Sequence, residues 1–178
     1  MNIKVDGEMS KYFYSKDLAL VIISQIGTAG GTGYAIEYTG SAIKNLSMES
    51  RMTLCNMTIE AGATTGLVAV DDTTIEYVQN RPYAPKEQNL AEAKKFWKNL
   101  ISDHGVHYDK TINIDISKSS PMITWGTSPE MAVNVDGKLP DLEDEKFSDK
   151  RQDLINAFNY MGLKEKQNVN SIELDKIF

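Results

Sequence analysis

The stretch Gly66-Leu67-Val68-Ala69-Val70, followed at once by Asp71-Asp72, decides the fold class. Five apolar residues in a row that end at turn-forming residues are typical of a short strand covered on both faces. Strands of this kind occur mainly where helices pack on the two sides of a parallel sheet. We therefore expect this strand to belong to a central sheet covered by helices.

The segments around this stretch continue an alternation of strands and helices. The pattern predicts further strands over residues 3–5, 34–38 and 111–116, of which the last alternates most cleanly. It predicts helices over residues 16–26, 48–61 and 90–102, capped by Ser15, Ser47 and Asn89. This order indicates an α/β fold, a three-layer αβα domain with its sheet between helices.

The sequence changes in character after Pro121. Residues 122–125 are predicted to form one more strand, residues 140–149 an acidic linker, and residues 149–161 a helix that ends at Gly162. Before this point, Arg81-Pro82-Tyr83-Ala84-Pro85 predicts an extended connector, because two closely spaced prolines exclude a helix. We predict a domain over residues 1–118. Residues 119–178 are predicted to be a linker and the lead-in to another domain.

Composition excludes several classes of function. The 178 residues carry 19 Lys+Arg against 25 Asp+Glu, a net charge of −6, and no basic cluster, which argues against nucleic acid as a partner. The longest apolar run, Leu18–Ile23, is far shorter than the roughly 20 residues of a membrane span, and the first residues resemble no secretion signal. A single cysteine suits a reducing cytoplasm, where we expect the protein to be.

A glycine-rich loop over residues 27–33 invites a phosphate-binding interpretation. It lacks the spacing of known phosphate loops, and it follows a helix and precedes a strand, the wrong order for a helix N-terminus to hold an anion. We expect Gly30, Gly31 and Gly33 to form a structural turn that requires positive φ.

Two acidic or histidine-containing segments could bind a cation. His104 and His107 lie near Asp103 and Asp109, but this segment reads more readily as an exposed loop. Asp71-Asp72-Thr73-Thr74 is better explained as a helix cap. We therefore predict no metal ligands.

The helix predicted over residues 48–61 carries the most informative polar pair. Met48, Met52, Cys55 and Ile59 share one stripe, which predicts a buried face on which Cys55 is a small core residue rather than a nucleophile. Asn56 and Glu60 lie four residues apart on the flank of that stripe. The pattern allows an exposed helix flank, an Asn–Glu hydrogen bond, or a site at which something polar meets both side chains.

Several motifs in collinear order resemble the aconitase superfamily, and within it the large subunits of isopropylmalate dehydratases. They span essentially the whole chain: Gly30-Gly31-Thr32-Gly33-Tyr34, residues 47–63 with Cys55-Asn56-Met57, Gly66-Leu67-Val68-Ala69, Arg81-Pro82-Tyr83-Ala84-Pro85 and Thr124-Trp125-Gly126-Thr127-Ser128-Pro129. The resemblance implies the middle α/β domain of that family, followed by the approach to the cluster-bearing domain.

The resemblance also implies a four-iron four-sulfur cluster in the full-length enzyme. The family's cluster cysteines lie in segments that nothing here matches, and Leu174–Phe178 resembles the stretch just before the first of them. We therefore expect an interior fragment that carries no cluster and is inactive alone. Cys55 matches a family position that is not a cluster ligand.

By the same resemblance, Glu60 would contact the iron-bound hydroxyl or water and Asn56 would lie near a cluster sulfur or thiolate. The implied enzyme is a hydro-lyase that interconverts 2- and 3-isopropylmalate, a hydroxy-dicarboxylate, in leucine biosynthesis. Its small subunit would supply a serine alkoxide as the base. The alternatives are homoaconitate hydratase or another hydratase of the family and, in a different class, a non-catalytic folded module.

Overall fold

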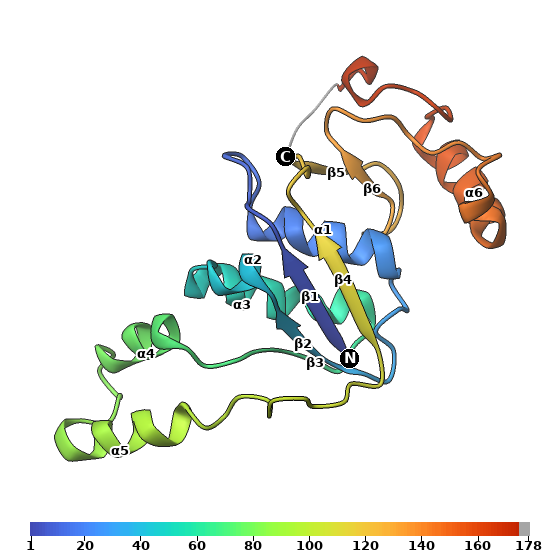
Figure 1. Ribbon diagram of the computed structural model, residues 1–178. Helices are drawn as coiled ribbons and strands as arrows, with labels where there is room; N and C mark the ends of the chain where they lie inside the picture. Colours follow the sequence, from blue (N-terminus) through green and yellow to red (C-terminus); the bar gives the residue numbers. More distant parts are fainter. Residues whose placement is uncertain (175–178) are drawn as a thin grey trace.

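A four-stranded parallel sheet forms the centre of the computed structural model, which describes residues 1–174, apart from the side chains of residues 145–147 (Figure 1). The strand order β3-β2-β1-β4 places the first strand inside the sheet. The strands are β1 (Asn2–Asp6), β2 (Ala35–Thr39), β3 (Thr65–Val68) and β4 (Thr111–Asp115). All three pairings are parallel, so the intervening chain must cross over between strands.

One face of the sheet packs against helices and carries the core. Side chains alternate along each strand, so in β1 the buried Ile3 and Val5 point to the helices and the exposed Lys4 points away. Helices α1 (Ser15–Ile26) and α3 (Met48–Asn56) cover this face. Each fully buried aliphatic side chain there contributes about 1.5–3 kcal/mol. The α/β fold with a parallel sheet flanked by helices is thus confirmed.

The opposite face is polar. Glu37 on β2 accepts hydrogen bonds from Ser102 Oγ at 2.6 Å and Tyr108 Oη at 2.7 Å, so the segment that returns to β4 crosses this side. On strand β3 the expectation of two covered faces is wrong, because Leu67 is 53% exposed. The physical reason is orientation: Leu67 pairs with Glu37 and lies on the polar face, whereas its neighbour Gly66 faces Thr58 of the helical layer.

The predicted helices differ from the observed ones at their ends. Tyr14, not Ser15, precedes α1, and its N–H donates to Asp17 Oδ2 at 2.8 Å. Ser47 does cap α3, by accepting from the Ser50 N–H at 3.2 Å. The predicted helix to Ala61 is α-helical only to Asn56 and then tightens into the 3₁₀ helix η1 (Met57–Ala61).

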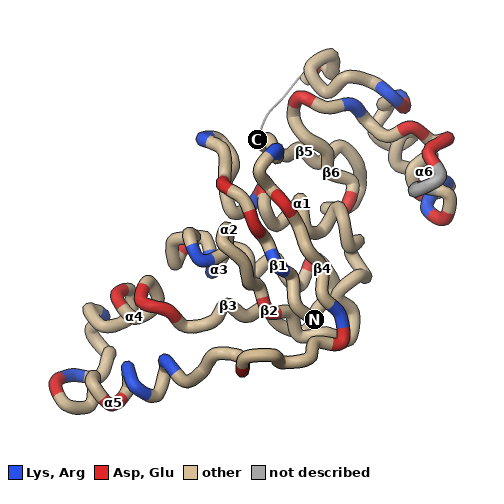
Figure 2. Tube along the Cα trace, in the orientation of Figure 1, with Lys and Arg blue, Asp and Glu red and all other residues tan. Residues whose placement is uncertain are grey.

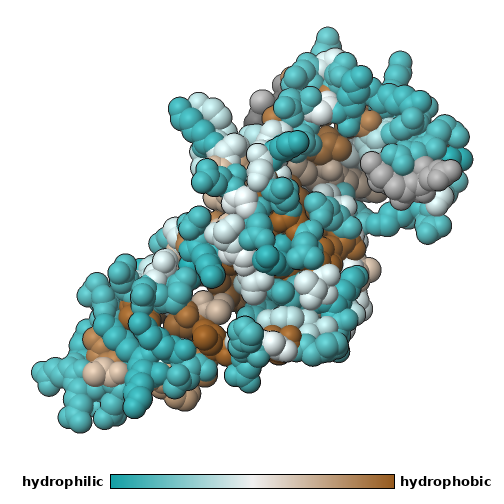
Figure 3. All heavy atoms as spheres, viewed as in Figure 1, coloured by the Kyte–Doolittle hydropathy of each residue, from teal (hydrophilic) through white to brown (hydrophobic). Residues whose placement is uncertain are grey.

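Two helices form an arm that extends from the sheet (Figure 1). Short α2 (Ser41–Lys44) follows β2, and the arm consists of α4 (Asp72–Gln79) and α5 (Glu87–Trp97). The proline segment joins these two helices, but the extended conformation predicted for it is wrong: it forms a turn in which the Ala84 N–H donates to the Arg81 carbonyl oxygen at 3.1 Å. The cap predicted at Asn89 is wrong, since α5 begins after Lys86. The helix predicted to residue 102 ends at Trp97, and Leu100 and Ile101 after it are each 53% exposed (hydrophobic side chains near this arm are visible in Figure 3).

The C-terminal part has a hydrophobic cluster of its own. It contains the hairpin β5 (Met122–Thr124) and β6 (Ala132–Asn134), the helix α6 (Arg151–Met161), and the 3₁₀ helices η2 (Glu145–Lys150) and η3 (Val169–Ser171). Trp125 stacks on Phe158 with ring centroids 4.5 Å apart. The predicted helix and its end at Gly162 are confirmed, with α6 starting two residues later. The division at residue 118 stays a prediction.

Candidate functional site

The exposed side of α3 and η1 carries the polar pair identified in the sequence. Asn56 and Glu60 are both exposed, and beside them Met52 is 42% and Ile59 60% exposed. The buried stripe predicted from Met52 and Ile59 is therefore wrong. The buried side chains of this segment are instead Arg51, Leu54, Thr58 and Ala61, two of them polar, so hydropathy alone selected the wrong face.

The 3₁₀ turn changes how Asn56 and Glu60 relate to each other. In a 3₁₀ helix, residues three apart eclipse, so Glu60 lies over Met57 rather than over Asn56. Within residues 1–174, neither side chain makes a hydrogen bond or ion pair, which excludes the Asn–Glu hydrogen bond considered from the sequence. The exposed Glu60 matches the expectation of a solvent-accessible carboxylate.

Buried hydroxyl groups anchor η1 between these two residues. Thr58 is 1% exposed, and its Oγ1 lies 2.8 Å from Tyr38 Oη on strand β2 and 3.0 Å from the carbonyl oxygen of Leu54. Burial raises the pKa of Tyr38 to about 12, so this phenol stays protonated. Sequence analysis missed both residues, because a threonine in a helix and a tyrosine in a strand carry no distinct signal.

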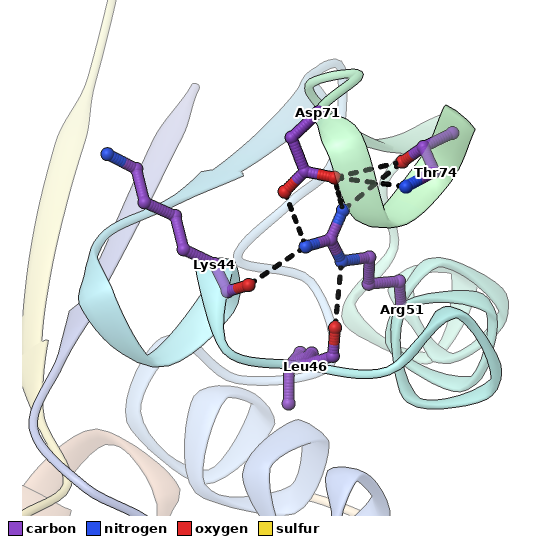
Figure 4. A network of polar contacts seen from close by, with 5 residues as sticks. All are labelled: Lys44, Leu46, Arg51, Asp71 and Thr74. Atoms are coloured by element: carbon purple, nitrogen blue, oxygen red, sulfur yellow. Dashed lines mark hydrogen bonds and ion pairs between the residues drawn. The ribbon is translucent and has the colours of Figure 1, made fainter. Parts of the chain in front are cut away.

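Arg51 is the second anchor of the site helix (Figure 4). Its guanidinium is 3% exposed and binds Asp71 through two hydrogen bonds of 2.7 and 2.6 Å. It also donates to the carbonyl oxygens of Leu46 at 3.2 Å and Lys44 at 2.9 Å. Asp71 in turn caps α4 by accepting from the Thr74 N–H, which confirms the cap interpretation of this segment.

The glycine loop packs directly behind Glu60. The Gly31 N–H donates to the carbonyl oxygen of Ala61 at 2.8 Å. A Cβ on Gly30 would lie 2.0 Å from the carbonyl oxygen of Ile26, so this position requires glycine for space. Only Gly33 of the three predicted glycines has the positive φ we expected, at +80°.

A groove that sequence analysis did not anticipate lies between the end of α1 and the C-terminal part. It encloses about 970 Å³ and is lined by Gly27, Trp125, Glu130, Lys138 and Lys150, among others. Thr28 Oγ1 donates to Glu130 at 3.4 Å, and Lys150 also pairs with Glu130, so a polar chain links the glycine loop to this groove.

Charged side chains and possible metal ligands are spread over the described part of the chain rather than gathered at one place. Figure 2 shows Lys and Arg distributed over several elements rather than gathered on one. His104 and His107 are exposed, as the loop interpretation expects. Among the described residues, no three His, Cys, Asp or Glu side chains are grouped closely enough to hold a metal. In the same part of the chain, no helix has both the length and the apolar composition needed to cross a membrane.

The comparison with known families covers the whole chain. The sequence model of the aconitase family (aconitate hydratase) matches residues 1–178. The chain belongs to the aconitase family. Full-length members of this family are iron–sulfur hydro-lyases, which remove and add water.

The aconitase-family cluster finds no ligand set in the described residues. Such clusters take cysteine thiolates, whereas Cys55 is the single cysteine here. It is half-buried, and burial raises the pKa of its thiol, which disfavours the thiolate. Cys55 alone therefore does not make a ligand set for such a cluster within residues 1–174.

Proposed function

We propose that this chain is part of the large subunit of 3-isopropylmalate dehydratase, a hydro-lyase that interconverts 2- and 3-isopropylmalate in leucine biosynthesis. Membership of the aconitase family supports the reaction class. The motifs Arg81–Pro85 and Thr124–Pro129, which resemble those of isopropylmalate dehydratase large subunits, support the narrower assignment.

The observation that carries the proposal is the exposed polar pair on α3 and η1. Glu60 is a carboxylate with no cation beside it in the described part of the chain, and Asn56 is an amide on the same exposed side. Exposed Met52 and Ile59 next to them offer an apolar surface. A ligand with a hydroxyl group for the polar pair and a branched aliphatic side chain for the apolar surface fits this combination.

In the proposed reaction, Glu60 handles the proton of the leaving hydroxyl group. Protonated Glu60 donates to the hydroxyl oxygen as the C–O bond breaks, and water departs. A serine alkoxide from the small subunit removes the proton from the neighbouring carbon, whose C–H electron pair becomes the double bond. Addition of water in the opposite orientation completes the isomerisation. Asn56 orients the groups around Glu60 through its amide.

The partner is therefore the small subunit, which would close over the exposed side of α3 and η1. We place the enzyme in a reducing cytoplasm, where a single unpaired cysteine such as Cys55 is normally kept as the thiol.

The test uses the complete enzyme, assembled with its small subunit and checked for iron content. Glu60→Gln preserves size and removes the ionisable group, so turnover of isopropylmalate should fall by about 100- to 10,000-fold. Asn56→Ala should cost less. Glu49→Gln, an exposed glutamate in the first turn of the same helix, is the matched control and should keep full turnover.

Retention of more than about a tenth of the turnover by Glu60→Gln, with its cluster intact, would contradict the role of Glu60. Turnover of homoaconitate in preference to isopropylmalate would keep the reaction class and overturn the substrate.

A further inference from the structure

The buried hydroxyl pair beneath η1 lies at the point where the site helix changes its geometry. Thr58 is two residues after Asn56 and two before Glu60, and it belongs to the first turn of η1. Its hydroxyl group is enclosed: Tyr38 approaches from strand β2, and a Cβ on Gly66 of strand β3 would lie 2.3 Å from Thr58 Oγ1. The side chain of Thr58 is therefore held in one orientation.

The number of hydroxyl hydrogens determines which group donates in the two hydrogen bonds of Thr58 Oγ1. Thr58 has one hydroxyl hydrogen, and only a donor can bond the Leu54 carbonyl, so that hydrogen is used there. Tyr38 must then be the donor to Thr58 Oγ1. Because burial raises the pKa of Tyr38 to about 12, this donor persists over the working pH range.

This relay competes with continuation of the α-helix. A threonine hydroxyl that bonds the carbonyl four residues earlier slightly destabilises a helix. Thr53 makes the same bond inside α3 without ending it, so the contact from Tyr38 is what distinguishes Thr58. The α-helix ends at Asn56, and the following residues tighten into η1, which closes with the Gly62 N–H bonded to the Ile59 carbonyl at 2.9 Å. The Tyr38–Thr58 contact thus ties the first turn of η1, between Asn56 and Glu60, to strand β2.

We propose that Tyr38 and Thr58 are positioning residues, which hold the η1 turn so that Glu60 is presented to the substrate. The inference rests on the proposed role of Glu60 and adds the residues through which the sheet fixes its orientation. Neither residue touches the substrate, since Thr58 is 1% and Tyr38 3% exposed.

The test compares two hydroxyl deletions on one helix. Thr58→Val preserves the shape of the side chain and removes both hydrogen bonds of the Thr58 hydroxyl group. Thr53→Val is the matched control, because Thr53 Oγ1 makes the same bond, to the Glu49 carbonyl at 3.0 Å, but does not contact Tyr38. In the complete enzyme, Thr58→Val should lower kcat by up to about 100-fold with little change in KM. Thr58→Ser should keep kcat near the wild-type value, and Tyr38→Phe should lower kcat as Thr58→Val does.

A second readout needs no activity. In the 178-residue chain, amide hydrogen exchange over residues 60–62 should accelerate about five- to tenfold in Thr58→Val, as expected for loss of one hydrogen bond. It should stay unchanged in Thr53→Val. If Thr58→Val fails to fold, Tyr38→Phe supplies both readouts.

A double-mutant cycle separates positioning from general support. Combined with Glu60→Gln, Thr58→Val should cost almost nothing further in kcat, because there is no longer a carboxylate to orient. Fully additive losses would overturn the inference and leave the proposed function intact, as would a wild-type rate for Thr58→Val. A wild-type rate for Glu60→Gln would instead overturn the proposed function.

Discussion

The guanidinium of Arg51 forms a bidentate pair with the carboxylate of Asp71, with Nη1 2.7 Å from Oδ1 and Nη2 2.6 Å from Oδ2. The pair joins the start of the site helix α3 to the first turn of α4, although the arginine is almost fully buried. Two parallel charge-assisted hydrogen bonds fix orientation as well as distance. The exposed side of α3 therefore has a defined angle relative to the arm.

The substitution Asp71→Asn tests the charge of this pair, because it removes the negative charge and keeps the size of the side chain. Asparagine still caps α4, but it leaves the buried guanidinium of Arg51 without a counter-charge. We expect a loss of about 2–3 kcal/mol in the free energy of unfolding, less than for a fully buried pair because Asp71 is 38% exposed. Urea denaturation measures it. Asp72→Asn, which breaks an exposed ion pair with Lys98, is the control and should change stability by less than about 1 kcal/mol.

The same pair should make stability depend on pH. The Arg51 guanidinium beside Asp71 holds the pKa of that carboxyl below its ordinary value of 3.8. Because the folded-state pKa is lowered, the stabilisation is complete above pH 3.8 and is lost as pH falls through the folded-state pKa.

Wild type and Asp71→Asn should therefore differ by a constant amount in unfolding free energy above about pH 5 and converge below pH 3.8. A difference that stayed constant down to pH 2 would show that the loss has another origin.

The glycine loop should respond to substitution in a definite order. Gly30→Ala should be the most destabilising, because its Cβ would overlap the Ile26 carbonyl oxygen. Gly33→Ala has open space but positive φ, so it should cost about 1 kcal/mol, and Gly33→Asn less. Thermal unfolding with and without inorganic phosphate checks both effects. A phosphate-dependent rise of several degrees in wild type would revive the phosphate-site interpretation.

The 178-residue chain should not assemble a cluster. With Cys55 as its single, half-buried thiol, anaerobic treatment with iron and sulfide should give no visible charge-transfer absorption. The complete enzyme, reconstituted in parallel, serves as the positive control. Stoichiometric iron uptake by the chain with turnover of isopropylmalate would contradict the assignment of the ligands to other segments.

Sequence patterns predicted the strands and missed the orientation of the site helix. Strand β4 alternates strictly, so its position could be read directly. In α3 and η1 the buried positions include Arg51 and Thr58, whose burial depends on partners from β2 and from the cap of α4 that are distant in sequence. Hydropathy therefore assigned Met52 and Ile59 to the core although both are exposed.

The candidate site was found only because a resemblance pointed to Asn56 and Glu60. The pattern of residues 48–61 alone allowed an exposed flank equally well. The change to a 3₁₀ turn at Met57 was not predicted, because the pattern of residues 48–61 reads as one continuous helix. The edge position of β3 was missed for a similar reason: local sequence does not reveal which strand lies outermost.

The place of β1 inside the sheet has a consequence for biosynthesis. β1 and β2 leave the ribosome before β4 and can pair, but Asn2 finds Thr111 only after the whole α4–α5 arm has been translated. Until then one edge of β1 stays open next to apolar side chains, and open edges promote pairing with other nascent chains. Such distant pairing is also slow. The length of the arm thus sets the interval during which this edge of a newborn chain is open to wrong pairing.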